Sequence, residues 1–174
     1  MNRTLALVIF PVLAGCAVRG NAQTSSDEHR LRLFNTHTRE HMDVVYRRGG
    51  EYIPDALSKL DVFLRDNRTG EIRQFDPKLF DMLSDLTSAS GRSNAEIDII
   101  CGYRTPSTYE FLRKHTSGVA RNSLHMQAEA IDIRLPGLKT STLRDVALEL
   151  GRGGVGYYSS SDFIHVDLGR VRRW

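Results

Sequence analysis

Apolar side chains recur at two spacings along this chain, and each spacing predicts one kind of element. Spacings of three and four residues predict helices, because they place apolar side chains on one helical face. These helices are expected from near Pro54 to Asp66, from Pro77 through Leu86, from Pro106 to about His115, and from Ser141 to Leu150. Alternating apolar and polar residues predict strands in an opening hairpin (residues 31–46), at Glu96–Cys101, at Ala128–Leu135, and in a terminal hairpin of Val155–Tyr158 and Phe163–Leu168.

Helix-start residues and turn formers support this division of the chain. Asp76-Pro77 and Thr105-Pro106 each pair a capping side chain with proline at the first helical position. The four polar residues 159–162 favour a turn between the last two strands. Strands and helices do not alternate in βαβ fashion, and 174 residues suit one domain. The sequence therefore predicts a single α+β domain, with a mainly antiparallel sheet and flanking helices.

The N-terminal residues predict export. Arg3 precedes an apolar run, Leu5–Ala14, that is too short to span a bilayer but suits the core of a signal peptide. Leu13–Cys16 resembles the lipobox at which bacterial lipoproteins are cleaved and acylated on cysteine. This predicts a signal peptide over residues 1–16, a flexible tether over 17–30 and the folded domain over 31–174. The alternative is cleavage after Ala22, with a signal peptide over 1–22.

A lipidated Cys16 would make the membrane a partner only through its anchor. Ala17 follows it in place of the aspartate associated with retention at the inner membrane. We therefore expect a periplasmic protein anchored to the outer membrane.

The charge is weakly basic and dispersed. The net charge is +3 and the pI about 9.0, with arginines scattered along the chain. Nucleic-acid binding would require a clustered basic face or a stacking motif, and neither is present in the sequence. The composition thus excludes a nucleic-acid partner and weakly favours an acidic one.

The chain has only two cysteines, Cys16 and Cys101. Lipidation of Cys16 would leave Cys101 as a lone thiol. Because Cys101 follows Ile97, Ile99 and Ile100, we expect it to be a small buried hydrophobic side chain rather than a nucleophile, since reactive thiols need an electropositive, partly exposed setting. A disulfide between the two cysteines is the alternative if lipidation does not occur.

The candidate chemistry lies in two segments, Ser123–Asp132 and Phe163–Asp167. They contain two imidazoles and a carboxylate, a set that suits a catalytic zinc with one coordination position left for water. Strand alternation places Asp132 on the face opposite two isoleucines, and His165 on the same face as Asp167. The sequence therefore predicts one face rich in donor atoms.

The order of these residues, Ser-x-His-x-x-x-x-Ala-x-Asp with a later His-x-Asp, resembles the zinc D-Ala-D-Ala peptidase family. That family includes carboxypeptidases, dipeptidases and murein endopeptidases, and it shares its fold with the Hedgehog signalling domain. Gly102–Arg104, Gly153–Tyr158 and Trp174 are more similar to its murein endopeptidase branch. The resemblance covers about residues 30–174. Ala128 departs from it, because the family has glycine there and an added methyl group could disturb unusual backbone dihedrals.

The resemblance implies a role for each matching residue. His125, Asp132 and His165 would bind one zinc per chain. Arg104 matches a family arginine that engages the substrate, and a guanidinium can fork onto a carboxylate or hold a carbonyl. Ser123 would either hydrogen-bond the site or cap a turn.

The general base has two candidates. Family members often have an acid three residues before the last histidine, a position that Asp162 occupies here. A regular strand would turn Asp162 away from His165, but a turn conformation could bring it back. Asp167 shares the face of His165 and is the alternative, either as the base or as a partner that orients the imidazole.

Together these features predict an exported zinc metallopeptidase whose partner is peptidoglycan. The resemblance implies a murein endopeptidase that hydrolyses peptide crosslinks involving meso-diaminopimelate. A D-Ala-D-Ala carboxypeptidase on the same site and a non-catalytic, zinc-stabilised cell-wall-binding module are the alternatives. The sequence does not indicate an oligomeric state.

Overall fold

The computed structural model describes residues 28–115 and 123–174. The predicted signal segment, the lipobox with Cys16, the alternative cleavage site at Ala22 and most of the predicted tether lie outside these residues. No helix in the described ranges is both long enough and apolar enough to cross a membrane.

The described residues form strands and helices in an order that is not a regular βαβ alternation. The strands are β1 (Glu28–Asn35), β2 (His41–Arg48), β3 (Glu51–Tyr52), β4 (Glu96–Cys101), β5 (Ala130–Arg134), β6 (Gly154–Tyr158), β7 (Phe163–Asp167) and β8 (Arg172–Arg173). The helices are α1 (Pro54–Phe63), α2 (Pro77–Ala89), α3 (Pro106–His115) and α4 (Thr140–Leu150), with short 3-10 turns η2 (Leu124–Gln127) and η3 (Ser159–Ser161).

These strands make one sheet in the order β3-β2-β1-β4-β5-β7-β6-β8. The β1–β4 and β6–β8 pairs are parallel, and every other neighbouring pair is antiparallel. The predicted α+β class with a mainly antiparallel sheet is therefore confirmed.

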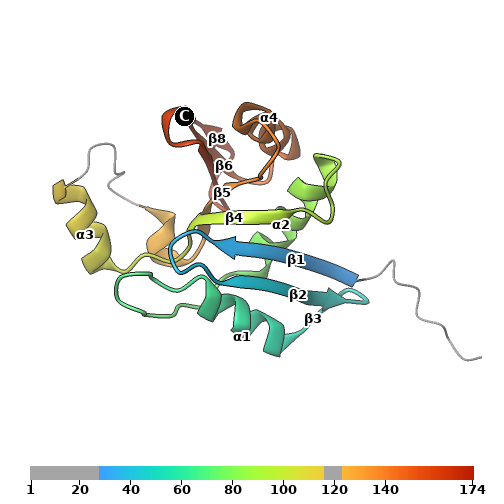
Figure 1. Cartoon of the computed structure of the whole chain (residues 1–174), viewed down its shortest axis with the longest axis horizontal. Helices are drawn as coiled ribbons and strands as arrows, with labels where there is room; N and C mark the ends of the chain where they lie inside the picture. The colour runs from blue at the N-terminus through green and yellow to red at the C-terminus, as the bar shows by residue number, and fades with distance from the viewer. Residues whose placement is uncertain (1–27, 116–122) are drawn as a thin grey trace, which may run out of the picture.

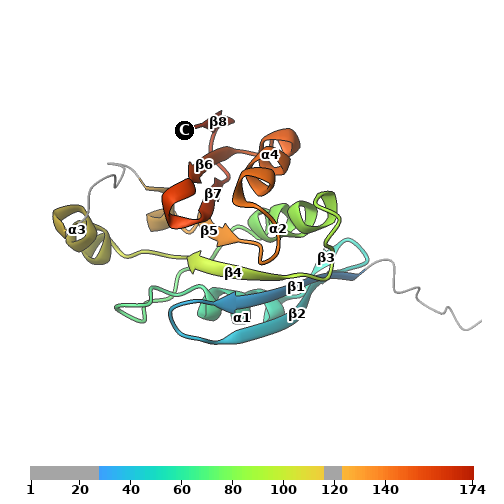
Figure 2. The ribbon, with the colours of Figure 1, turned by 45° about the horizontal axis from the view of Figure 1, so that its top comes forward.

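Three helices cover one side of this sheet. Helix α1 packs on β2, α2 on β1, and α4 on β6 and β7, while α2 and α4 also contact each other (Figures 1 and 2). Helix α3 lies apart from them, beyond the end of β4. The helix-covered side is therefore the buried side.

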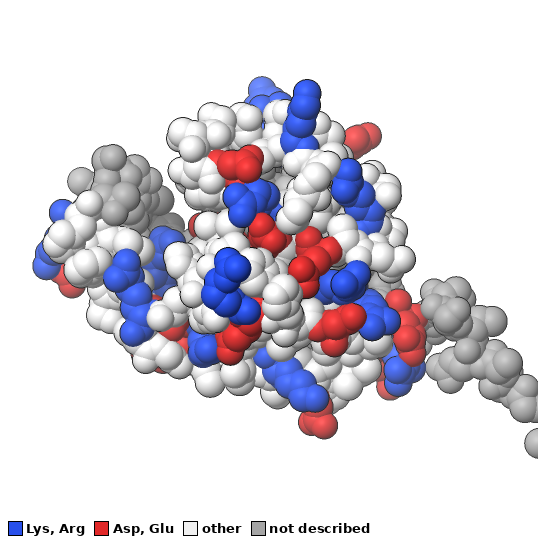
Figure 3. Space-filling view, in the orientation of Figure 1, with Lys and Arg blue, Asp and Glu red and all other residues white. Residues whose placement is uncertain are grey.

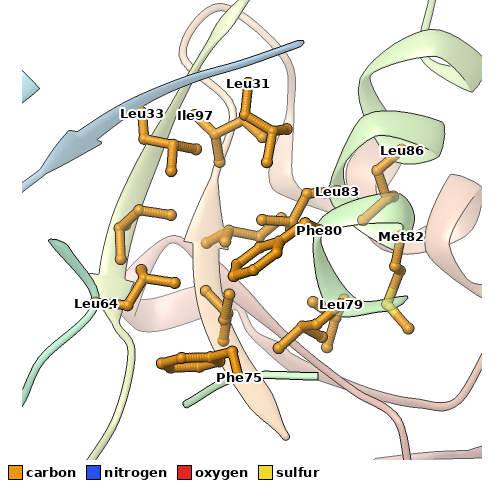
Figure 4. Packing of buried hydrophobic residues seen from close by; sticks show 14 of the residues in the cluster. Leu31, Leu33, Leu64, Phe75, Leu79, Phe80, Met82, Leu83, Leu86 and Ile97 are labelled. Carbon is orange, nitrogen blue, oxygen red and sulfur yellow. The ribbon is translucent and has the colours of Figure 1, made fainter. Parts of the chain in front are cut away.

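The core lies between α2 and the centre of the sheet. Figure 4 shows Leu31 and Leu33 of β1 and Ile97 of β4 facing Phe80 and Leu83 of α2. The alternate residues of β5 and β7 join the same core: Ile131, Ile133, Ile164 and Val166. Because side chains alternate along a strand, the residues between them point to the opposite face of the sheet.

The surface drawn in Figure 3 mixes the two signs of charge, with basic and acidic side chains interleaved over β1 and β2. Arg30 pairs there with Asp43, and Arg48 with Glu28. This surface is therefore not a uniformly basic patch.

Several element boundaries differ from those predicted: β1 begins at Glu28, inside the predicted tether, and α2 continues to Ala89. Two further differences have a local structural cause. Helix α1 ends at Phe63 rather than Asp66, because the Leu64 carbonyl accepts a hydrogen bond from Tyr103 N (2.8 Å) instead of continuing the helix. Strand β5 begins at Ala130 rather than Ala128, because Ala128 has a left-handed backbone (φ 56°). This conformation favours glycine, yet Ala128 adopts it with its side chain fully buried.

Candidate metal centre

Three buried side chains meet on the sheet face that points away from α2 and α4. Asp132 of β5 and His165 of β7 pair directly across the sheet, and His125 comes from η2. Asp132 Oδ1 lies 2.9 Å from His165 Nδ1 and 3.1 Å from His125 Nε2, and the two ring nitrogens are 3.1 Å apart. Each residue is less than a tenth exposed. The structure thus brings together the three residues that the sequence predicted as ligands.

Outer hydrogen bonds decide which ring nitrogens carry hydrogen. His125 Nδ1 lies 2.8 Å from the carbonyl oxygen of Gly102, and His165 Nε2 lies 3.0 Å from Asp167 Oδ2. Both oxygens can only accept, so these nitrogens are the donors. When the rings are neutral, as metal binding requires, their other nitrogens turn lone pairs inward toward Asp132 Oδ1, so that three lone pairs converge.

This arrangement fits a tetrahedral zinc ion. Ligand distances of about 2.0–2.1 Å place neighbouring ligand atoms about 3.3 Å apart in a tetrahedron. The observed separations of 2.9–3.1 Å need to widen by only a few tenths of an ångström. The outer partners on both rings are also those typical of metal-binding histidines.

The electrostatics of the cluster favour a cation. Burial lowers the pKa of His125, but Asp132 and Cys101 outweigh it and raise the pKa well above the usual value. Burial raises the pKa of Asp132, but His125 and His165 outweigh it and hold the pKa far below its usual range. The Asp132 carboxylate is therefore ionised. The lone pairs that attract a proton to this cluster would also bind a divalent cation.

Asp167 is a fully buried carboxylate with several donors around it. Besides His165, it accepts hydrogen bonds from Arg172 (2.7 and 2.9 Å) and from the N–H groups of Gly154 (3.1 Å) and Gly169 (2.8 Å). Burial raises its pKa, but these bonds lower it well below the usual range. This geometry suits a group that orients His165, one of the two roles the sequence left open.

Asp162 lies in a turn before β7, with a left-handed backbone (φ 54°). Its side chain is 61% exposed and 3.7 Å from Arg134, and it accepts a hydrogen bond from Thr140. The hydrogen bonds and ion pairs found among the described residues do not connect it to the three donors. Its role as general base remains a prediction from the sequence, and this exposed position does not support it.

A cavity of about 460 Å³ opens beside Asp132. Its lining includes Cys101, Tyr103, Arg104, Asp132 and Phe163. Arg104 is thus placed where it can meet a ligand that approaches the donors, and its role in substrate binding stays a prediction.

Ser123 is buried at the N-cap position of η2. Its side chain makes no capping hydrogen bond, so the capping role is wrong. Its hydrogen bonding to the site stays a prediction.

Cys101 was expected in the core, but the structure places it half-buried on the donor face. The β4–β5 pairing shifts between Ile99 and Cys101, leaving Ile100 as an extra residue. Such a bulge reverses the alternation that follows it, and Cys101 pairs with Asp132. Within the described residues, Cys101, His125 and Asp132 form a possible metal-binding group.

Trp174 also borders the site. Its ring lies 5.3 Å from that of His165, and its Nε1–H donates to the Tyr158 hydroxyl (3.0 Å). It crosses β6 at Gly156, where a Cβ atom would come within 2.7 Å of the indole. A glycine inside a strand can mark such a close approach. Gly156 is therefore the feature of the sequence that could have indicated an aromatic ring packed against β6.

Comparison with known proteins extends the resemblance over nearly the whole chain. A family described as peptidoglycan L,D-endopeptidase MepK matches residues 23–174. Over 177 aligned residues, the chain is 40% identical to "Probable peptidoglycan L,D-endopeptidase MepK" of Haemophilus influenzae, covering 99% of this chain and 95% of that protein. It is 37% identical to "Peptidoglycan L,D-endopeptidase MepK" of Escherichia coli K12, covering 99% and 97%. The likeness therefore includes the sheet and helices as well as the donor motifs.

Proposed function

The chain belongs to the family described as peptidoglycan L,D-endopeptidase MepK, and from this premise we propose that it is a zinc-dependent peptidoglycan endopeptidase. Its substrates would be peptide crosslinks that involve meso-diaminopimelate. The observation that carries the metal assignment is the convergence of three lone pairs from His125, Asp132 and His165 at 2.9–3.1 Å.

These three residues would hold one zinc ion. Bound there, the ion would lower the pKa of a coordinated water and polarise the scissile carbonyl. Asp167 keeps hydrogen on His165 Nε2 and leaves Nδ1 free to bind. The Gly102 carbonyl does the same for His125. The rings are therefore held ready as ligands by groups that do not themselves bind the ion.

Arg104 would bind the substrate. Arg104 lines the cavity beside Asp132, where its positive charge suits a peptide that carries carboxylates, as diaminopimelate crosslinks do. A planar guanidinium can bind a carboxylate through two parallel hydrogen bonds. Phe163 and Tyr103 supply apolar surface in the same cavity.

The place of action follows from the N-terminal sequence. Arg3, the apolar run Leu5–Ala14 and the lipobox Leu13–Cys16 support export and lipidation on Cys16. The protein would then reach peptidoglycan from an anchor in the outer membrane, across the residues between Cys16 and β1. Cys16→Ser should release it from membranes and abolish labelling by a radioactive fatty acid.

Digestion of purified sacculi tests the activity. Protein is incubated with crosslinked sacculi, with a chelator, and with chelator followed by zinc, and the released muropeptides are identified by mass. Crosslinked dimers should decrease and monomers accumulate only where zinc is present. His165→Ala serves as the inactive control.

Other outcomes would point to the rival functions. Loss of the terminal D-Ala from pentapeptides, with crosslinks intact, would indicate a carboxypeptidase. Sedimentation with sacculi that releases no product would indicate a binding module. Release that survives complete removal of metal would contradict the zinc proposal.

A further inference from the structure

The Cys101 thiol lies among the atoms proposed to bind the metal. A nitrogen of His125, a carboxylate oxygen of Asp132 and Cys101 Sγ all lie within 4.8 Å of one another. A tetrahedral zinc would hold a thiolate sulfur about 3.6 Å from a nitrogen or oxygen ligand, given Zn–S and Zn–N distances of about 2.3 and 2.0–2.1 Å. Relative to His125 and Asp132, a side-chain movement of about 1 Å therefore brings the sulfur into range.

The direction of approach also matters. Cys101 lines the cavity with Asp132 and Arg104, and it pairs with Asp132 across β4 and β5. The sulfur therefore lies beside Asp132 at the cavity. The cavity is the side from which a fourth ligand, or a substrate, would arrive.

We propose that the Cys101 thiolate is a fourth ligand of the metal in the substrate-free protein. The inference rests on the proposed function, since it takes the ion to be bound by His125, Asp132 and His165. Thiolate is a soft ligand that zinc accepts readily alongside imidazole. The thiol binds as the thiolate, and its proton is released to solvent.

Four protein ligands close a zinc site, whereas a catalytic site needs an open position. Substrate must therefore displace the thiolate before reaction, and Arg104 connects the two events. Arg104 Nη2 donates a hydrogen bond to Cys101 Sγ (3.1 Å). A substrate carboxylate that draws Arg104 to itself removes this bond from the sulfur, so recognition of substrate weakens the closed state.

Cobalt substitution tests the proposal without any need for turnover. The full chain with Cys16→Ser, in which Cys101 is the remaining thiol, is compared with the double variant Cys16→Ser/Cys101→Ser. Both are loaded with Co²⁺. We expect visible absorption from bound cobalt in both proteins, and a near-ultraviolet thiolate-to-cobalt charge-transfer band that the double variant loses.

The alternative spectra separate this inference from the proposed function. If both proteins bind cobalt and their near-ultraviolet spectra are the same, Cys101 is not a ligand, and the three-ligand centre is unaffected. If neither protein binds cobalt, the metal centre itself is refuted, and the inference falls with it.

Alkylation of Cys101 provides a second test in the same Cys16→Ser protein. Zinc should protect the thiol from iodoacetamide, and a chelator should restore its reactivity, as measured by the mass of the peptide that carries Cys101. Asp132→Ala, in the same background, is the matched control: it should react at one rate with and without zinc. If the thiol of the Cys16→Ser protein, with Asp132 intact, reacted equally fast in the zinc-loaded and chelated states, the proposal would be overturned.

Discussion

One aspartate precedes β7 in a turn and another is the last residue of β7, and the two aspartates have opposite surroundings. At the start, Asp162 is 61% exposed in a left-handed turn and contacts Thr140 and Arg134. At the end, Asp167 is fully buried and bound to His165 and Arg172. His165 lies between them in the sequence, within β7.

This difference shows that distance along the sequence is a poor guide to a carboxylate's role. Asp162 is three residues from His165, and Asp167 is two. The regular strand carries Asp167 to the face of His165, whereas the turn directs Asp162 toward α4. Hydrogen-bond partners, rather than spacing, distinguish a carboxylate that orients a ligand from one on the surface.

Removing any one of the three proposed metal ligands should have the largest effect. His165→Ala, Asp132→Ala and His125→Ala each delete one of three converging donors, so bound zinc should fall from one per chain to none and sacculus digestion should cease. Elemental analysis and muropeptide release measure the two effects.

His41→Ala is the matched control for the ligand variants, because His41 is an exposed histidine on β2 paired with Glu96. It should keep zinc and activity. Full zinc content in any of the three ligand variants would contradict the assignment of that ligand.

Asp167→Asn should have the next largest effect. The variant loses the charge that faces His165 and Arg172, and losing such a partner typically weakens metal binding or activity by about ten- to a hundredfold. We expect weaker zinc affinity in a chelator competition, and partial recovery of activity in excess zinc.

Asp98→Asn is the matched control for Asp167→Asn. Asp98 accepts hydrogen bonds from Arg134 on the same sheet face. Among the described residues these bonds involve no histidine, so replacing Asp98 should leave zinc affinity unchanged. Unchanged zinc affinity in Asp167→Asn, with turnover reduced at least about a hundredfold, would instead make Asp167 the general base.

The sequence predicted those parts of the fold and site that follow a regular period. Strands β5 and β7 keep strict alternation, so the shared face of Asp132 and His165 could be read from residue order. Cys101 could not be placed this way, because the single extra residue Ile100 reverses the alternation and nothing in the local composition marks it.

The contact between Trp174 and His165 was also beyond prediction. The ring of Trp174 reaches His165 because β8 pairs with β6. A pairing of two short strands is set by tertiary packing rather than by a local pattern.

Asp66 provides a measure of what a buried carboxylate contributes when no histidine contacts it. It is 1% exposed and accepts hydrogen bonds from Thr105 N and Oγ1 and from the N–H groups of Arg68 and Thr69. Asp66→Asn turns an amide toward Thr105 donors, which should lower the free energy of unfolding by about 1–3 kcal/mol. Zinc affinity should not change.

The effect of Asp66→Asn should depend on pH. Burial raises the pKa of Asp66, but its hydrogen bonds outweigh this and lower the pKa. The carboxylate therefore stabilises the fold fully above its unfolded pKa of about 3.9, and this contribution is lost as the pH falls through the lower folded value. Denaturant unfolding should show the difference from wild type shrinking in acid; a constant difference would contradict this.

Asp162→Asn should have the smallest effect and is the sharpest test of the comparison. An exposed ion pair such as Asp162–Arg134 contributes about 0–1 kcal/mol, and Arg134 keeps its bonds to Asp98. We expect full zinc content, a small change in stability and less than about a tenfold loss of turnover. Loss of a general base would cost about a hundred- to ten-thousandfold, so a smaller loss means that Asp162 is not the base.

Thr140→Val, which removes the hydroxyl that binds Asp162, is the matched control. If Asp162→Asn lost at least a hundredfold in turnover with zinc retained, while Thr140→Val did not, Asp162 would be the base. Its carboxylate would then have to turn from Arg134 toward the metal when substrate binds.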